Sequence, residues 1–249
     1  MTVLVTGATA GFGAATARRF AREGARVVAV GRRRERLEKL AAELGERLHP
    51  LELDVSDRGA VETALGALPP AFAEVTVLVN NAGLALGLEP AYEAEMADWE
   101  TMVDTNVKGV LYCTRALLPG MVARDRGHVI NIGSVAGSYP YPGGNVYGAT
   151  KAFVHQFSLN LRADLTGHNV RVTCVEPGLA ETEFAMVRFK GDAEKAKAPY
   201  QGVTAMSGDD IAETVYFVAT LPPHVNVNRI EVMAVMQSFN HFVIARDTD

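Results

Sequence analysis

Cysteine is nearly absent from this sequence of 249 residues: only Cys113 and Cys174 are present, far apart in the chain. They form no CxxC pair, so neither a disulfide framework nor a cysteine zinc site is expected, which suits a reducing compartment. Histidine is also sparse, and its six copies show no HxH or HExxH spacing, so no metal is expected. We expect both cysteines to be small buried hydrophobic residues.

Long apolar runs and a strongly unbalanced charge are missing as well. No run approaches the length of a membrane span, and a first strand beginning almost at Met1 leaves no room for a signal peptide. A cytoplasmic protein without a membrane partner is therefore expected. The formal net charge of -5 and the pI of about 5.7 give a nucleic-acid partner no electrostatic support. Basic residues cluster once, at Arg32, Arg33, Arg34 and Arg36.

What the sequence does contain is an alternation of short apolar strands and amphipathic helices. This alternation is typical of βαβ units, whose right-handed crossovers build a doubly wound parallel sheet with a ligand crevice at the carboxyl ends of the strands. We predict a Rossmann-type α/β fold of about seven strands with helices on both faces. One domain is expected over residues 1–249, with a substrate lid at 181–201. The predicted strands are 2–6, 26–30, 48–53, 75–79, 129–132 and 170–175, and the predicted helices lie near 11–23, 34–44, after 57, 106–123 and 146–164.

A glycine-rich loop, GATAGFG at residues 7–13, joins the first predicted strand to the first predicted helix. Glycines at this junction permit a tight turn and let the backbone approach a pyrophosphate, while the helix start offers free N–H groups and the positive end of its dipole. Three glycines considered alone are equally compatible with a structural turn. Their position after the first strand favours a dinucleotide phosphate site.

The same loop, together with Thr6, resembles the TGxxxGxG signature of the short-chain dehydrogenase/reductase family. The resemblance covers essentially the whole chain, and it implies a nicotinamide-dependent oxidoreductase that acts on a carbonyl or hydroxyl group. The further matches follow in the family's order: NNAG at 80–83, Asn106, Ser134, YGATK at 147–151, and Pro177-Gly178 with Thr182.

The end of the second predicted strand indicates which nicotinamide cofactor is used. An acidic residue there would bind the adenosine ribose of NAD, but this sequence reads Val30-Gly31-Arg32-Arg33. A planar guanidinium suits the 2′-phosphate of NADP(H), so we predict NADP(H) as the cofactor, bound by Arg32 and Arg33. The alternative is that both arginines are solvated residues at the start of a helix, where a cation is disfavoured.

The resemblance also implies which other residues surround the cofactor. Asp54 and Val55 are expected beside the adenine, and the Pro177 segment along the nicotinamide, with Thr182 reaching its carboxamide or phosphate. The asparagines of the NNAG segment are expected on the adenosine side of the cofactor, although a structural role at the sheet edge fits them equally well. The residues expected to bind NADP(H) are Gly7, Thr9, Gly11, Phe12, Gly13, Arg32, Arg33, Asp54, Val55, Asn81, Ala82, Gly83, Tyr147, Lys151, Pro177, Gly178, Leu179 and Thr182.

Tyr147 and Lys151 are four residues apart, so they share one face of a helix. In the resembled family the matching tyrosine donates a proton to the carbonyl oxygen as hydride arrives. A free tyrosine has a pKa of about 10, and the Lys151 ammonium and the oxidised nicotinamide are expected to lower it. Ser134, at a carboxyl strand end, is expected to hydrogen-bond the substrate oxygen. The resemblance implies that Lys151 binds the nicotinamide ribose and that Asn106 holds a water in the proton path, and Asn106 is also compatible with a buried residue that kinks its helix.

A finer resemblance concerns the substrate. Several segments resemble one branch of the family, the NADP-dependent 3-hydroxy acid dehydrogenases, which act on serine-like hydroxy acids and malonic semialdehyde. Residues 179–182 depart from the glycine-rich segment expected there. Because a small acid needs a cationic partner, Arg188 and Lys190 are candidates for clamping a carboxylate, although either could be solvated. The resembling segments are 7–13, 81–87, 98–102, 187–191 and the tail from 220–222 to 237–239.

Two other functions fit the same residues. A sulfoacetaldehyde reductase would also need cations such as Arg188 and Lys190 to bind its sulfonate, whereas a general ketone or aldehyde reductase would not need them. An NADP-sensing regulator without turnover should lack part of the set Ser134, Tyr147 and Lys151, all of which are present. In the resembled family the helices near 106–123 and 146–164 pair between subunits, so a homotetramer or dimer is expected, although periodicity alone does not separate this from packing within one chain.

Overall fold

Short runs of apolar, mostly β-branched residues form the strands at the centre of the molecule. All five residues of β1 (Thr2–Thr6) and all four residues of β4 (Val77–Asn80) are buried. Strands covered on both faces carry such continuous apolar runs because neither face meets water. The computed structural model describes residues 1–238, so Phe239, at the end of the resembled tail, lies outside the described part.

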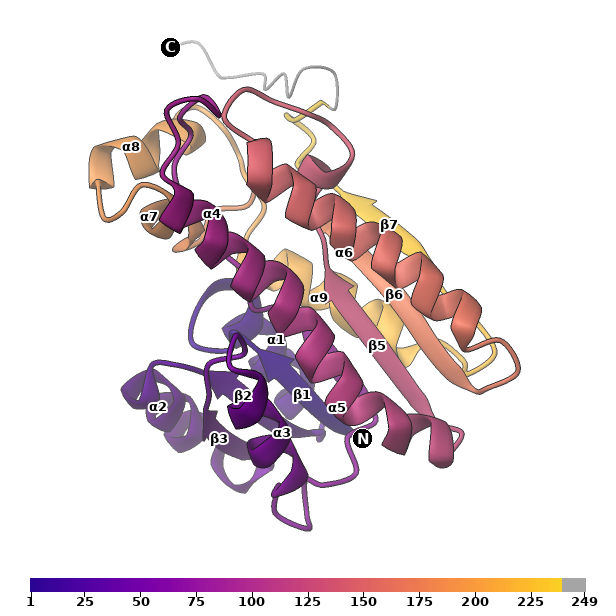
Figure 1. Cartoon of the computed structure of the whole chain (residues 1–249). Coiled ribbons are helices and arrows are strands. Elements are labelled where there is room, and N and C mark those ends of the chain that lie inside the picture. Colours follow the sequence, from indigo (N-terminus) through magenta and orange to yellow (C-terminus); the bar gives the residue numbers. More distant parts are fainter. Residues whose placement is uncertain (239–249) are drawn as a thin grey trace.

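Within the described residues, seven parallel strands form one sheet in the order β3-β2-β1-β4-β5-β6-β7 (Figure 1). β1 has β2 on one side and β4 on the other, so the direction of winding reverses between β1 and β4. Ligands bind at this switch point in doubly wound sheets. The predicted Rossmann-type fold is confirmed. The other strands are β2 (Arg26–Gly31), β3 (Leu48–Glu52), β5 (Gly127–Ile132), β6 (Val170–Pro177) and β7 (Arg229–Val232).

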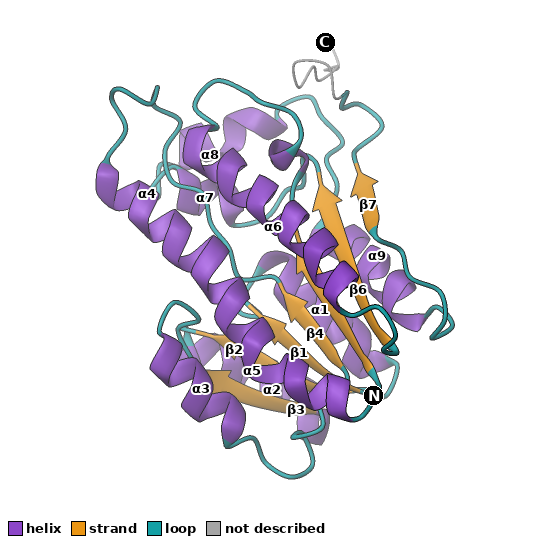
Figure 2. Cartoon of the chain, turned by 45° about the vertical axis from the view of Figure 1, so that its right-hand side comes forward, coloured by secondary structure: helices purple, strands orange, loops and turns teal. Residues whose placement is uncertain are grey.

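Helices cover both faces of the sheet (Figures 1 and 2). Val3 and Val5 of β1 belong to the core on one face and Leu4 to the core on the other, because successive side chains of a strand point in opposite directions. The helices that contribute to the first core are α1 (Gly11–Arg22), α2 (Arg34–Leu44) and α9 (Gly208–Thr220). Those that contribute to the second are α3 (Arg58–Gly66), α5 (Gly109–Ala123) and α6 (Asn145–Asp164).

Most predicted element boundaries agree with the structure to within about two residues, the usual spread of such assignments. The strand 2–6 and the helix 34–44 begin and end where they were predicted. The N-cap of α3 is Asp57, whose carboxylate accepts a hydrogen bond from the Ala60 N–H at 3.0 Å. The predicted strand 75–79 begins only at Val77. β7 was not placed by the sequence, and it is defined by its parallel pairing with β6.

Two segments near the carboxyl ends of the strands depart from the regular alternation. α4 (Met96–Val103) continues through one π-helical turn at Asp104–Lys108 into α5. Residues 181–201, named the lid segment here, form α7 (Phe184–Arg188), α8 (Ala193–Lys197) and a final 3-10 turn. Figure 1 shows α7 and α8 beside the upper end of α4. The role of this segment as a substrate lid remains a prediction.

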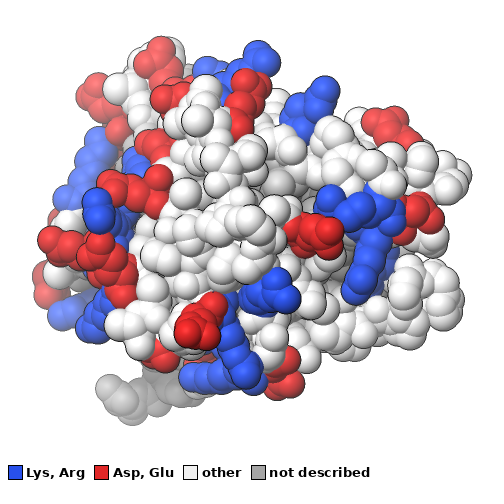
Figure 3. Space-filling model, turned by 90° about the horizontal axis from the view of Figure 1, so that it is seen from below, with Lys and Arg blue, Asp and Glu red and all other residues white. Residues whose placement is uncertain are grey.

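The surface carries charges of both signs. On the face in Figure 3, basic and acidic side chains are interspersed around a broad uncharged area. Among residues 1–238, no helix is both long enough and apolar enough to cross a membrane.

Both cysteines lie in the interior, as predicted, with exposed fractions of 1% for Cys113 and 0% for Cys174. Burial raises the pKa of each thiol to about 12. Because the thiolate is the reactive form, neither side chain is a nucleophile at neutral pH.

Candidate active site

The glycine loop leads from β1 into α1 as the sequence predicted. Gly7 has a φ of +67°, a left-handed conformation that glycine adopts without strain. A Cβ at Gly13 would collide with the carbonyl oxygen of Gly7, so only glycine lets α1 begin this close to the loop. Ala10, the N-cap of α1, makes no side-chain hydrogen bond to the first turn. The N–H groups at the start of α1 are therefore available to an anion such as a pyrophosphate.

Most of the predicted site residues line one crevice at the carboxyl ends of the strands. Those that line it are Gly7, Thr9, Gly11, Phe12, Arg32, Arg33, Asp54, Val55, Asn81, Ala82, Gly83, Ser134, Tyr147, Lys151, Pro177, Gly178 and Thr182. The predicted residues outside its lining are Gly13, Asn106, Leu179, Arg188 and Lys190. Lining residues that the sequence analysis missed include Gly31, Leu84, Thr105, Glu183, Phe184 and Val187.

The three residues predicted to carry the chemistry meet at the carboxyl end of β5. Tyr147 and Lys151 lie on α6 and are buried, with exposed fractions of 9% and 6%. The Lys151 ammonium donates to the carbonyl oxygen of Ile132, the last residue of β5, at 2.8 Å. Ser134 follows in the next turn and hydrogen-bonds Tyr147, while its hydroxyl oxygen accepts from the Ala136 N–H at 3.1 Å.

Burial governs the ionisation of both side chains on α6. It raises the pKa of Tyr147 above its usual value, and the charge of Arg188 and the hydrogen bond with Ser134 oppose this only in part. It lowers the pKa of Lys151 to about 8. We predicted that Lys151 lowers the pKa of Tyr147. In the protein without cofactor, the cation that lowers this pKa is instead Arg188, whose guanidinium carbon lies 5.0 Å from the Tyr147 ring centroid. Tyr147 therefore stays protonated at neutral pH, which is the form that can donate a proton.

Asn106 lies in the π-helical turn between α4 and α5 and is 1% exposed. Its amide donates to the carbonyl oxygen of Leu84 at 2.8 Å and to the Thr150 hydroxyl at 3.1 Å, and its carbonyl oxygen accepts from the Leu84 N–H at 2.8 Å. A Cβ at Gly83 would lie 3.2 Å from the Asn106 oxygen and 3.4 Å from the Lys151 ammonium. Asn106 thus holds the chain after β4 in place, and Gly83 lies next to both its side-chain oxygen and the Lys151 ammonium.

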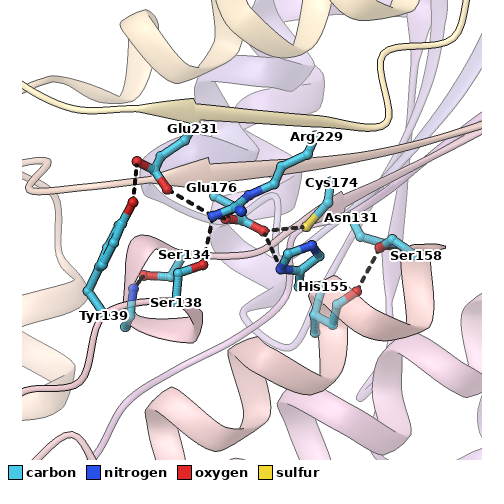
Figure 4. A network of polar contacts seen from close by, with 12 residues as sticks. Asn131, Ser134, Ser138, Tyr139, His155, Ser158, Cys174, Glu176, Arg229 and Glu231 are labelled. Atoms are coloured by element: carbon cyan, nitrogen blue, oxygen red, sulfur yellow. Dashed lines mark hydrogen bonds and ion pairs between the residues drawn. The ribbon is translucent and has the colours of Figure 1, made fainter. Parts of the chain in front are cut away.

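A buried carboxylate, which the sequence analysis missed, supports the wall behind Ser134. Glu176, near the end of β6, is 1% exposed, and a Cβ at Gly133 would lie 2.9 Å from its Cγ. The carboxylate accepts from Arg229 Nε of β7 at 2.7 Å and lies 3.4 Å from His155 Nδ1 of α6 (Figure 4). β6, β7 and α6 therefore share one polar cluster next to the turn that carries Ser134.

The same arginine also fixes the far end of that turn. Arg229 Nη2 donates to the Ser138 hydroxyl at 2.6 Å and to Glu231 at 2.9 Å (Figure 4). Ser138 directly follows the 3-10 turn 135–137, which begins next to Ser134. The turn that positions Ser134 thus contacts Glu176 at its start, through Gly133, and Arg229 at its end, through Ser138.

The lid segment places aromatic and cationic side chains on Tyr147. The Phe184 ring centroid lies 5.6 Å from that of Tyr147. The Arg188 guanidinium lies over both rings, 5.1 Å from Phe184, and its Nη2 donates to the Tyr141 hydroxyl at 3.0 Å. Its buried Nε has no hydrogen-bond partner among the described residues.

The second predicted cation of the lid segment lies elsewhere. Lys190 has a positive φ of 52° and follows the end of α7. Its ammonium pairs with Asp98 of α4 at 2.7 Å, and its side chain is 55% exposed. The structure therefore brings Arg188, but not Lys190, to Tyr147.

At the opposite end of the crevice, the arginines after β2 face both the glycine loop and the lid segment. Arg33 Nε and Nη2 donate to the Thr9 hydroxyl at 3.0 and 2.7 Å, and its Nη1 donates to Glu183 at 3.0 Å. Arg36 donates to the same Glu183 carboxylate at 2.7 Å. Arg32 lies 3.6 Å from Asp54 and is 65% exposed.

The crevice fits a dinucleotide. The close approach at Gly13 and the uncapped start of α1 form a cradle for a pyrophosphate. Gly31 keeps the end of β2 open, since a Cβ there would lie 2.6 Å from the Thr9 methyl group. Two arginines follow at the position where an acid would bind an unphosphorylated ribose.

Comparisons with known proteins agree with this geometry. Residues 1–193 match the family model described as short chain dehydrogenase. The chain is 63% identical over 240 residues to the NADP-dependent 3-hydroxy acid dehydrogenase YdfG of Salmonella typhi, covering 96% of this chain and 97% of the relative. It is 54% identical over 247 residues to serine 3-dehydrogenase of Agrobacterium fabrum, covering 99% of each.

A similar solved structure is described as the closed form of serine dehydrogenase complexed with NADP+. The TM-score is 0.96 at 58% identity, covering 99% of this chain and 100% of that one. A serine dehydrogenase structure from Escherichia coli matches with a TM-score of 0.86 at 55% identity, covering 96% of this chain and 100% of that one. The crevice, with Ser134, Tyr147 and Lys151 in its lining, and these matches together place the chain in the short-chain dehydrogenase family.

Proposed function

We propose that the chain is an NADP(H)-dependent oxidoreductase that transfers hydride between the nicotinamide and a small 3-hydroxy acid or the corresponding semialdehyde, with serine-like acids and 3-hydroxypropionate as substrates. The observation that carries the substrate class is Arg188. Its guanidinium lies over Tyr147 with a buried Nε that has no partner among the described residues. A buried donor without a partner is unfavourable, and a substrate carboxylate would satisfy it.

The cofactor assignment rests on the other end of the crevice. Arg32 and Arg33 would hold the 2′-phosphate of NADP(H), the glycine loop its pyrophosphate, and Pro177 and Thr182 its nicotinamide end. When bound, the cofactor supplies or accepts the hydride. The relatives named above are described as NADP-dependent or complexed with NADP+, which supports the same cofactor here.

The chain's own residues would handle the proton and the oxygen of the substrate. In the reductive direction, Tyr147 donates its hydroxyl proton to the carbonyl oxygen, and Ser134 hydrogen-bonds the same oxygen as its charge develops. Lys151, on the same face of α6 and with its ammonium 5.9 Å from the Tyr147 ring centroid, would favour the phenolate that remains only when the cofactor is bound. Asn106 lies beside Lys151 and would hold a water through which the proton is replaced. Arg188, which lies over the rings of Tyr147 and Phe184, would orient the carboxylate so that the reacting carbon lies near the Tyr147 hydroxyl.

Turnover of matched substrates by matched variants tests the acid specificity. Arg188→Met should raise the KM for 3-hydroxypropionate about 10- to 100-fold, as expected for losing a charged hydrogen bond, and should leave the uncharged 3-hydroxypropanamide unaffected. Lys190→Met is the control, because it removes a cation only two residues away. Equal effects of both variants, or turnover of the amide alone, would exclude the acid-binding role. Faster turnover of 2-hydroxyethanesulfonate than of the carboxylate would favour the sulfonate alternative.

We also propose that the protein assembles as a homotetramer or dimer in the cytoplasm. Met96 and Val103 of α4 are 60% and 37% exposed, and Leu159 of α6 is 36% exposed. Apolar side chains at these positions would gain from burial against a second copy. Two free buried cysteines suit a reducing compartment.

A further inference from the structure

The lid segment is tied to the arginines at the adenosine end of the crevice through a single carboxylate. Glu183 is the N-cap of α7, and it accepts from Arg33 at 3.0 Å and from Arg36 at 2.7 Å. The three side chains are 48%, 46% and 45% exposed, in the same order. Arg33 lies 150 residues before Glu183 in the chain, and Arg36 lies 147 residues before it. This contact joins two parts of the site that the proposed reaction uses for different purposes.

The geometry of Arg33 allows it to serve both partners at once. Its Nε and Nη2 edge points at the Thr9 hydroxyl of the glycine loop, and its Nη1 points at Glu183. The Nε and Nη2 edge presents two parallel N–H groups, the arrangement with which arginine binds a phosphate bidentately. A 2′-phosphate can therefore replace the Thr9 hydroxyl on that edge without removing Glu183 from the other.

We propose that Glu183 is a positioning residue that couples recognition of the cofactor 2′-phosphate to the placement of α7 over the substrate site. This inference rests on the proposed function. Glu183 fixes Arg33 with its phosphate-binding edge toward the crevice, and a bound phosphate in turn fixes Arg33 for Glu183. Because α7 also carries Phe184 and Arg188, an ordered Glu183 holds both of these side chains over Tyr147. Coupling between two sites is reciprocal, so the ordered lid also favours the phosphorylated cofactor.

The charges around Glu183 are suited to this coupling. Arg36 remains on Glu183 when Arg33 shares its charge with a phosphate, so the carboxylate keeps a cationic partner. All three side chains are about half exposed, and ion pairs in such positions are weak and easily broken. The lid can therefore open again to release product.

Hydrogen exchange of the lid segment tests the proposal without measuring turnover. With the full chain and saturating cofactor, NADP+ should slow amide exchange in residues 181–201 several-fold more than NAD+ does. Glu183→Gln should abolish this difference, and calorimetry should give weaker NADP+ binding with unchanged NAD+ binding. Glu181→Gln is the matched control, since none of the ion pairs found in residues 1–238 includes Glu181, and it should keep the difference.

Three results would overturn the proposal. The first is an undiminished difference between NADP+ and NAD+ in Glu183→Gln. The second is tighter NADP+ binding in that variant, because Glu183 would then compete with the phosphate for Arg33. The third is full additivity of Arg36→Gln and Glu183→Gln in NADP+ affinity, since residues that act through one contact are coupled. Absence of any preference for NADP+ in the unmodified protein would instead remove the proposed function itself, and the coupling with it.

A steady-state readout separates this coupling from a merely structural role. In Glu183→Gln the KM for the hydroxy acid should rise several-fold with NADP+ and stay unchanged with NAD+, because only the phosphorylated cofactor uses the contact. A fold defect would raise both KM values alike, and that result would count against the proposal.

Discussion

Two carboxylates next to arginines lie at different parts of the crevice, and they differ chiefly in burial. Glu176, behind Ser134, is 1% exposed and pairs with Arg229, whereas Glu183 in the lid segment is 48% exposed and pairs with Arg33 and Arg36. A buried charge that loses its partner has no water to replace it, but an exposed one does. Burial therefore makes the first contact costly to break, whereas the second is easily broken.

The largest effect is expected when the buried contact is broken. Glu176→Ala should lower the free energy of unfolding by about 3 kcal/mol, because it removes a 1% exposed carboxylate that is the acceptor for Arg229 Nε and the partner of His155 Nδ1, although Arg229 Nη2 keeps Ser138 and Glu231. Denaturation by urea, followed by circular dichroism, measures the change. Glu231→Ala is a suitable control, since it removes a 26% exposed acid from the same arginine, and a loss as large as that of Glu176→Ala would refute the role of burial.

Lys151 is a buried cation that has no acidic partner, since its ammonium donates to the carbonyl oxygen of Ile132, and it offers a second test of how burial affects a charge. Burial lowers the pKa of Lys151 to about 8 from 10.5. In the cofactor-free protein, the charged ammonium of Lys151 destabilises the folded state fully below pH 8. Between pH 8 and 10.5 the folded protein loses this proton while the unfolded chain keeps it, so the destabilisation disappears as the pH rises. The stability of the unmodified protein should therefore rise over this range relative to Lys151→Met, by up to about 3 kcal/mol. Unfolding curves at several pH values measure the difference, and a constant difference would contradict the lowered pKa.

The smallest effect is expected for the exposed carboxylate. Glu183→Ala should change the free energy of unfolding by less than about 1 kcal/mol, the range of surface ion pairs. Added salt should reduce even this difference, because exposed charges are screened. The same urea titrations at low and high salt test it. A loss comparable to that of Glu176→Ala would mean that Glu183 belongs to the rigid frame and that the lid segment does not open.

The sequence was sufficient for elements whose own residues determine them. The apolar run of β1 and the charged, amphipathic α2 were placed with their observed bounds, because burial and periodicity are local properties. β7 was missed, since its four residues read Arg-Ile-Glu-Val and only the pairing with β6 makes them a strand. Tyr147, Lys151 and Ser134, which were predicted from motif and spacing, line the same crevice in the structure, and their catalytic roles remain predictions.

Contacts between distant segments explain what the sequence analysis missed. Glu176 meets Arg229, and Glu183 meets Arg33 and Arg36, across large stretches of chain, so no spacing indicates either pair. Arg188 and Lys190 are two residues apart and looked equivalent. The end of α7 separates them, because Arg188 is still helical and Lys190 follows the helix with a positive φ.

The contact between Gly31 and Thr9 limits how the cofactor preference could be redesigned. An acid at the end of the second strand is the usual feature of an NAD enzyme, but a side chain at position 31 would push against the Thr9 methyl group, 2.6 Å from the new Cβ. Moving Thr9 would also take its hydroxyl from Arg33. An engineer seeking an NAD-dependent variant should therefore leave Gly31 unchanged and introduce the acid at position 32, whose side chain is 65% exposed.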